Sequence, residues 1–209
     1  MERRGEYIMM KGFAIMIAAV LLLSACGGGG GDYSPKPRGF FRIDFPKKAY
    51  QDYQSPYPFT FKYPVYATIE KDTQSRVGPN LLNMTHLLNM QFKQFNATLH
   101  LSYETVPSKQ VFNQLVEDAR KLAFKNTVKS PRIEQVNLAI PERKIWGIYY
   151  NIDGNAASSA QFFLTDSTHH YLRGALYFNN EPRLDSIQPV LEFIKKDIGK
   201  MIDSFRWKE

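Results

Sequence analysis

The chain holds little of the chemistry that enzymes usually draw from cysteine and histidine. Its 209 residues include one cysteine, Cys26, and four histidines. No His-x-x-x-His pair, Walker loop, dinucleotide-binding fingerprint or Ser-His-Asp order is present. His169 and His170 are adjacent, and neighbouring residues of a strand point to opposite faces, which disfavours a shared metal ion. We therefore predict no catalytic residue, no metal site and no cofactor.

Basic residues are not concentrated in one stretch. The 27 Lys and Arg against 20 Asp and Glu give a net charge of +7, of which the first 25 residues supply +1. The sequence has no run of Lys and Arg with interleaved aromatic residues, the pattern typical of proteins that follow a phosphate backbone. We expect no nucleic-acid partner, because this spread of charge suits a surface close to anionic lipid headgroups better.

The one cysteine is placed as in a bacterial lipoprotein signal. A positively charged flank precedes the almost wholly apolar run 12–23, and Leu23-Ser24-Ala25 stands directly before Cys26. This run is too short to span a bilayer as a helix. We expect residues 1–25 to be removed as a signal peptide and acyl chains on Cys26 to anchor the mature chain in a membrane. No thiol then remains for a disulfide or a thiolate metal site.

A flexible tether follows the cysteine. Five glycines, 27–31, give the backbone maximal freedom, and two prolines within 33–37 favour an extended conformation. Residues 26–38 are therefore predicted to be a lipidated tether, and residues 39–209 a single domain. No acidic surface-export signal follows Cys26, so we expect this domain to face the periplasm.

Short alternating stretches of aromatic and β-branched residues dominate from residue 39 onward, which predicts strands. Phe59, Phe61 and Tyr63 repeat with a period of two, and Asn96 joins two strands of a predicted hairpin. The gaps are too short for crossover helices, so the pairing should be antiparallel. The predicted strands cover residues 41–45, 59–63, 65–69, 90–95, 98–103, 145–152, 160–164 and 171–178.

Two segments follow the 3.6-residue period of a helix. The first begins after a predicted N-cap at Ser108, and the second covers residues 187–205, with Ser186 as cap and Pro189 in the first turn. The fold class is therefore α+β, an antiparallel sheet covered by at least two helices. The order of elements resembles the PsbP and Mog1 type of α/β/α sandwich. Residues 72–88 fit neither period and are predicted to be a flap, a short helical excursion or an insertion capping the sheet.

One polar region is a candidate for binding. Small residues enter the strand after Asp153-Gly154, and polar residues follow on it and on the next strand, which would let a ligand approach closely. The candidate contact or groove residues are Ser158, Ser159, Gln161, Asp166, His170, Arg173 and Tyr177. In the alternative interpretation this is an ordinary hairpin, whose turn is shaped by Asp166 and Ser167, with Arg173 paired to a carboxylate.

Several longer segments resemble the GldD gliding-motility lipoproteins of Bacteroidetes, over essentially the whole mature chain. The segments that carry the resemblance are Tyr33 to Pro46, Tyr57 to Tyr66, Glu117-Asp118-Ala119-Arg120 and Gly154 to Phe178. The resemblance implies a periplasm-facing, membrane-anchored lipoprotein required for gliding motility and for the linked type IX secretion machinery. It implies no enzymatic activity, other motility and secretion proteins as partners, and one site residue, the lipidated Cys26.

Two other functions stay open at this point. A small-molecule or lipid-binding envelope module would use the cleft between sheet and helices. A hydrolase acting on peptidoglycan or glycan would need carboxylates from distant strands, such as Asp44, Asp153 and Asp166, to meet in one cleft.

Overall fold

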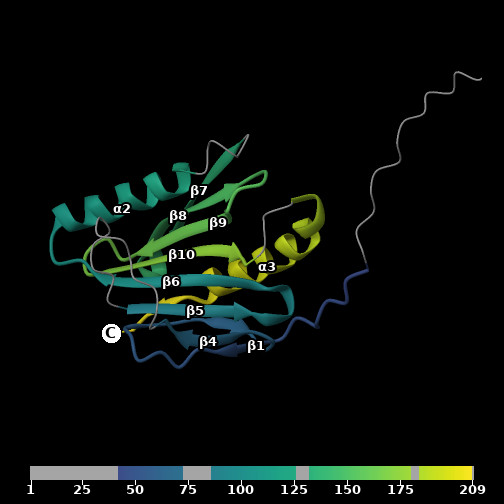
Figure 1. The fold of residues 1–209 in the computed structure, drawn as a ribbon. Coiled ribbons are helices and arrows are strands. Elements are labelled where there is room, and N and C mark those ends of the chain that lie inside the picture. Colours follow the sequence, from purple (N-terminus) through teal and green to yellow (C-terminus); the bar gives the residue numbers. More distant parts are fainter. Residues whose placement is uncertain (1–41, 73–85, 126–131, 180–183, 209) are drawn as a thin grey trace, which may run out of the picture. The chain divides into compact units, whose positions relative to one another are not determined.

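The computed structural model describes residues 42–72, 86–125, 132–179 and 184–208. In this part of the chain seven strands form one antiparallel sheet, in the order β4-β5-β6-β10-β9-β8-β7 (Figure 1). Their bounds are β4 Thr68–Lys71, β5 His86–Phe92, β6 Ala97–Thr105, β7 Ile133–Ile140, β8 Ile145–Ile152, β9 Ser158–Thr165 and β10 His170–Phe178. Two short pairs accompany the sheet: β1 (Tyr50–Asp52) with β3 (Lys62–Pro64), and β2 (Phe59–Thr60) with β11 (Arg206–Trp207).

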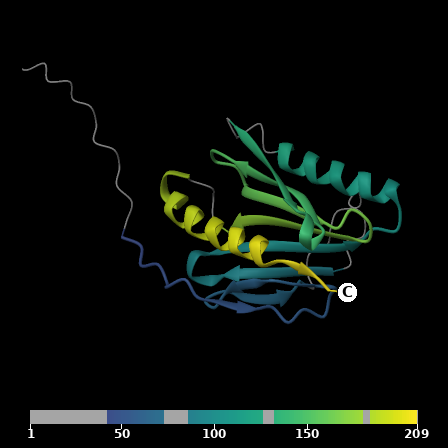
Figure 2. The ribbon, with the colours of Figure 1, turned by 180° about the vertical axis from the view of Figure 1, so that it is seen from behind.

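Two helices cover the sheet from opposite sides. Helix α2 spans Lys109–Phe124 and helix α3 spans Leu184–Ser204. Neighbouring residues of β9 show the division, since Phe162 packs in the cluster with α3 while Phe163 packs in the cluster with α2. Adjacent residues of a strand point to opposite faces of the sheet, so α2 packs on one face and α3 on the other, as the two views in Figures 1 and 2 show. Among the described residues, no helix combines the length and the apolar character that crossing a membrane requires.

The larger core lies between the sheet and α3. It is rich in aromatic rings that come from distant parts of the chain, and Phe59, Phe61 and Phe205 are each at most 1% exposed. Their rings stack within 6.4 Å of one another. Each such ring contributes roughly 1.5–3 kcal/mol by leaving water. The C-terminal residues are thereby fixed against the strand segment that opens the domain.

The predicted helix α2 is confirmed, and its N-cap with it. Ser108 has an extended backbone, and its hydroxyl accepts a hydrogen bond from the Val111 N–H at 3.3 Å. This satisfies one of the backbone donors that a helix start leaves free. The helix then buries Leu115, Ala119 and Ala123 against β8, β9 and β10.

The strongest strand predictions are also confirmed. Strand β8 has the predicted bounds 145–152, and β5 and β6 form the predicted hairpin. Asn96 lies between them in the left-handed region, with φ of 48°, after the short 3₁₀ helix η1 (Lys93–Phe95). A second 3₁₀ helix, η3 (Pro141–Arg143), makes a similar turn between β7 and β8. The α+β class, an antiparallel sheet with two helices, is confirmed as well, whereas membership of the PsbP and Mog1 type stays a prediction.

Four predictions of elements need correction. Residues 42–49 form no strand, because Phe45 stacks on the ring of Phe193 in α3 at 4.5 Å instead of pairing with a strand. Residues 65–67 form a turn before β4, and Leu87 and Leu88 belong to β5 rather than to a loop. Helix α3 begins at Leu184, so Pro189 lies inside the helix and not in its first turn. Residues 73–85, most of the predicted flap, lie outside the described part.

A buried carboxylate joins the start of the domain to α3. Asp197 is 1% exposed and lies on the buried side of α3, three residues after Ile194 and four before Met201. It accepts hydrogen bonds from the hydroxyls of Tyr50, at 2.8 Å, and Tyr66, and forms an ion pair with Lys48 Nζ at 2.6 Å. Burial lowers the pKa of Lys48, although its contact with Asp197 acts against that shift. A buried charge is tolerated when it is paired and hydrogen-bonded in this way.

We predict that Asp197→Ala lowers the free energy of unfolding by about 3 kcal/mol, because three donors lose their acceptor at once. Urea unfolding followed by circular dichroism measures this. Asp203→Ala is the matched control, since Asp203 lies on the exposed side of the same helix, and it should change stability by less than about 0.5 kcal/mol. Equal losses in the two variants would contradict the role given to Asp197.

Candidate functional site

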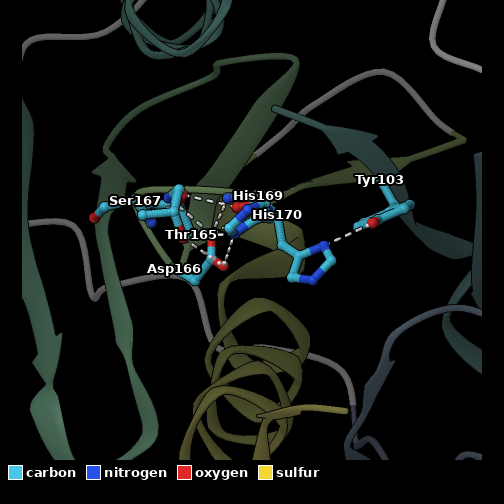
Figure 3. A network of polar contacts seen from close by, with 7 residues as sticks. Tyr103, Thr165, Asp166, Ser167, His169 and His170 are labelled. Atoms are coloured by element: carbon cyan, nitrogen blue, oxygen red, sulfur yellow. Dashed lines mark hydrogen bonds and ion pairs between the residues drawn. The ribbon is translucent and has the colours of Figure 1, made fainter. Parts of the chain in front are cut away.

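The turn between β9 and β10 is organised by one carboxylate (Figure 3). Asp166 Oδ1 accepts hydrogen bonds from the backbone N–H groups of Thr168, His169 and His170 at 2.8–3.0 Å. Its other oxygen accepts from the Thr168 hydroxyl at 3.0 Å. Ser167 adopts a left-handed backbone with φ of 68°, and its N–H donates to Thr165 Oγ1. Asp166 therefore serves the backbone of its own turn.

His170 connects this turn to the rest of the core. Its Nδ1 and the Tyr103 hydroxyl share a hydrogen bond of 2.8 Å, drawn in Figure 3. Its ring also stacks on Trp207 of β11 at 5.1 Å. Burial lowers the pKa of His170, so the ring is neutral at pH 7. These contacts belong to the face of the sheet that α3 covers.

A hollow of about 360 Å³ lies beside the turn. Its lining is polar and mostly basic: Glu142, Arg143, Lys144, Asp166, His170, Arg206, Trp207 and Lys208. Three of the cations already donate to backbone carbonyls: Arg143 to Asp203 at 2.5 Å, Arg206 to Phe205 at 2.8 Å and Lys208 to Ser55 at 2.5 Å. Much of the charge in this hollow is therefore used to hold the C-terminal segment.

A second polar region lies on the other face of the sheet, beside α2. We call it the polar face and define it by Asn89 of β5, His100 and Ser102 of β6, Gln161 of β9, and Arg173 and Tyr177 of β10. The strand register brings these residues together. Asn89 lies opposite His100, and Ser102 lies opposite Arg173. Ala175 lies between His100 and Gln161 and pairs with both.

Contacts within the polar face are direct. Arg173 Nη2 donates to Gln161 Oε1 at 2.6 Å. His100 Nδ1 lies 2.7 Å from Asn89 Oδ1, and its ring is 5.5 Å from the ring of Tyr177. Burial lowers the pKa values of both His100 and Arg173. The alternative interpretation predicted a carboxylate as the partner of Arg173. That prediction is wrong, because the described partner is the amide oxygen of Gln161.

The seven predicted groove residues thus divide into three groups. Gln161, Arg173 and Tyr177 share the polar face. Asp166 and His170 belong to the turn, with His170 facing α3. Ser158 and Ser159 are 0% and 4% exposed at a register shift of β9 against β10, and the Ser158 hydroxyl donates to the Ala160 carbonyl.

Sequence reasoning did not single out Asn89, His100 or Ser102. Their signal was present in β6, where His100 and Ser102 alternate with Leu99 and Leu101. Such alternation is the ordinary pattern of a strand with one solvated face. Only the register with β10 shows that these side chains meet Arg173 and Tyr177.

The carboxylates proposed for hydrolysis do not all meet. Asp153 follows β8 and Asp166 follows β9, so they lie at opposite ends of the eight-residue strand β9, roughly 25 Å apart. Asp44 is 87% exposed in the segment before β1. Among the described residues, no group of three His, Cys, Asp or Glu side chains is placed to hold a metal ion.

The contribution of Asp166 to the free energy of unfolding should depend on pH. Burial alone would raise the pKa of Asp166, but the backbone N–H groups of His170, His169 and Thr168 outweigh it and hold the pKa below the ordinary 3.8. A lowered carboxyl pKa adds stability above pH 3.8 that is lost as the pH falls through the folded-state pKa. Asp166→Asn should therefore cost about 1–2 kcal/mol at pH 7, and this difference should shrink in acid.

Urea unfolding of both proteins between pH 7 and pH 2 tests this prediction. Asp44→Asn serves as the control, because its carboxylate is exposed and accepts no described backbone N–H. A difference between wild type and Asp166→Asn that stays constant over the whole range would show that the carboxylate charge plays no part.

Comparison with known proteins gives the family of the chain. The family profile described as gliding motility lipoprotein GldD matches residues 30–207, which include β1 to β11 and both helices. No curated protein matches the chain. The match covers most of the sequence and includes the polar face and the β9–β10 turn. The resemblance noted in the sequence is confirmed, and the chain belongs to the GldD family of gliding motility lipoproteins.

Proposed function

We propose that the protein is a lipid-anchored, periplasm-facing accessory component of gliding motility and of the linked type IX secretion machinery, and that it acts through contacts with other proteins rather than as an enzyme. The observation that carries the proposal is the family match over residues 30–207, which ties the chain to lipoproteins of gliding motility. The secretion link, the orientation and the contact mechanism go beyond that match.

Residues 42–49, which connect the predicted anchor to the domain, are fixed by contacts with α3. Residues 42–49 continue the predicted tether, and within them Phe45 stacks on Phe193 of α3 and Lys48 pairs with Asp197 of α3. The Lys48 ammonium also lies 3.3 Å from the centre of the Phe193 ring. A pull on the acyl chains would therefore reach the core through α3. This arrangement suits a protein that stays at a membrane while its partners exert force.

The two edges of the sheet differ in how they avoid further strand pairing. Strand β4 has four residues, of which Glu70 and Lys71 are charged. Strand β7 has eight, with Glu134 alone charged, no proline, and an unbroken register against β8 from Ile133 to Ile140. Exposed edges are usually protected by charge, proline or a bulge. Within the described residues β7 pairs with β8 alone, so its outer edge suits an added strand.

A groove beside β7 indicates which residues a strand added to β7 would carry. It encloses about 390 Å³ between β7, β8 and α3, with an apolar floor that includes Val136 and Leu138. Val136 is 44% exposed. Glu134, Glu192 and Asp203 line the same groove, and its one cation, Lys195, already binds Asn151 and Glu192. We propose that an extended segment of a partner protein, with apolar residues alternating with Lys or Arg, adds to β7 here.

The anchor is tested by Cys26→Ala. Without the thiol no acyl chain can be attached, so the protein should leave the membrane fraction, and colony spreading should not be restored in a strain lacking the gene. Fractionation and spreading assays on the same cultures measure both. If the unanchored variant restored normal spreading and secretion, the account of location would be wrong.

The β7 groove is tested by Val136→Lys. The new charge opposes a basic partner and occupies the apolar floor, so we expect at least a tenfold loss of cross-linked partner and reduced spreading, with unchanged thermal unfolding. Val65→Lys is the matched control, because Val65 is 51% exposed in the turn before β4. Normal spreading of Val136→Lys would exclude this groove.

The same groove is also the cleft in which a small apolar ligand would bind. Native mass spectrometry of gently extracted protein separates the two occupants. A constant added mass in the wild type that disappears in Val136→Lys would show a ligand-binding module and contradict partner docking. An unmodified mass together with lost cross-linking would support a protein partner.

A further inference from the structure

Helix α3 is packed on one flank and open on the other. On the packed flank, Phe193 stacks on Phe45, and Asp197 pairs with Lys48. On the opposite flank, the β7 groove of about 390 Å³ lies between the helix and the strands β7 and β8. Figure 2 shows α3 between the segment that precedes β4 and these two strands. The flank toward the groove is therefore the accessible one.

A glycine interrupts the open flank of α3. Gly199 lines the groove, four residues after Lys195 and four before Asp203. A β-carbon placed on Gly199 would have no described atom within 4 Å, and the backbone there is ordinary helix, so neither packing nor conformation requires a glycine. Glycine is less favourable than alanine inside a helix. The missing side chain therefore weakens the helix and leaves its backbone open to whatever enters the groove.

The groove combines apolar side chains with a surplus of negative charge. Three carboxylates against one ammonium leave its lining with a net charge of −2; the charged residues are Glu134, Glu192, Asp203 and Lys195. Lys195 is already bound to Asn151 and Glu192. The Asp203 carboxylate has no partner among the described groups, since Arg143 binds the backbone carbonyl of that residue. A cation on a partner would therefore find a carboxylate one helical turn from Gly199.

A strand added to β7 has two sets of side chains, and one of them faces the groove. Val136 and Leu138 of β7 line the groove, whereas Asn137 lies opposite Ile148, which packs in the α2 cluster. The side chains of an added strand would follow the same alternation. On the α2 side β7 presents only uncharged residues: Ile133, Gln135, Asn137 and Ala139. Charge complementarity therefore directs the basic set of an alternating strand into the groove.

We infer that the β7 groove receives a long basic side chain, Arg or Lys, from the added strand, and that Gly199 is the residue that admits it. The apolar stem of this side chain lies against the helix backbone at Gly199 and over Val136 and Leu138. Its cationic head binds the Asp203 carboxylate. A side chain at position 199 would occupy the place of the stem. The inference rests on the proposed strand addition at β7 and specifies which set of its residues faces α3.

Binding of a capped peptide to the full mature protein in detergent tests the inference. The probe is acetyl-Thr-Val-Arg-Val-Arg-Val-Thr-amide, and the comparison peptide carries glutamine in place of both arginines. Calorimetry should show saturable binding of the arginine peptide, weakened at least tenfold in Gly199→Leu and in Asp203→Asn. Lys200→Leu is the matched control, because Lys200 is exposed next to Gly199 and does not line the groove, and it should leave binding unchanged.

Gly199→Ala separates binding from folding. It should raise the midpoint of thermal unfolding by about 2–4 °C, because alanine favours the helix and meets no described atom, and it should still weaken binding of the peptide. If Gly199→Leu does not fold, this variant and Asp203→Asn carry the test. A Gly199→Ala protein no more stable than the wild type would show that the fold itself needs the glycine, which contradicts the inference.

The other outcomes distinguish this inference from strand addition itself. Equal binding of the arginine and glutamine peptides, or equal binding to the wild type and Gly199→Leu, overturns the inference. Strand addition stands in that case if Val136→Lys abolishes binding of both peptides. No binding of the arginine peptide to the wild type also overturns the inference. Because no motility is measured here, each of these results leaves the accessory role to the tests of Cys26→Ala and of spreading.

Discussion

The buried carboxylate of Asp197 is the interaction on which the arrangement of this domain depends. It draws Lys48, Tyr50 and Tyr66, all from the segment that precedes β4, onto a helix that begins more than a hundred residues later. Apolar burial alone is non-directional and would leave this segment free to slide. A carboxylate with three specific donors fixes one position. The aromatic rings of the N-terminal segment and those of α3 can therefore stack in a single register, and the end of the domain that continues into the tether is bound to its last helix.

The sheet separates two kinds of chemistry. Toward α3 its residues are almost uniformly apolar and form the larger core. Toward α2 the apolar residues gather under the helix, on β8, β9 and part of β10, while β5 and β6 present polar side chains. A helix of sixteen residues is about 24 Å long and cannot cover a seven-stranded face. The uncovered strands β5 and β6 are therefore polar, and Arg173 of β10 and Gln161 of β9 meet next to them. The segment before β4 and the polar side chains of β5 and β6 thus lie on opposite faces of one sheet.

Sequence periodicity predicted those elements whose burial is decided locally. Strand β8 and the cap at Ser108 follow from patterns within ten residues. Strand β7 was missed, because an edge strand with mostly exposed residues shows little alternation. The role of Asp197 was not predicted, since its donors lie about 130 to 150 residues away in the sequence. The pairing of Arg173 with Gln161 depends on the register between β9 and β10. The alternation of residues within each strand does not specify that register.

An anchor and a strand edge complement each other energetically. Adding one strand to β7 would form a few backbone hydrogen bonds, each worth about 1 kcal/mol net, and association entropy offsets much of that gain. The edge alone therefore suits a weak partner. Acyl chains on Cys26 would confine the domain to within roughly 20 Å of the bilayer, and such confinement raises effective concentration toward the millimolar range. With a partner held at the same membrane, a contact too weak for dilute solution would become well populated. A lipid anchor would thus raise the occupancy of the proposed contact, and the exposed edge could stay weak enough to avoid pairing with unrelated chains.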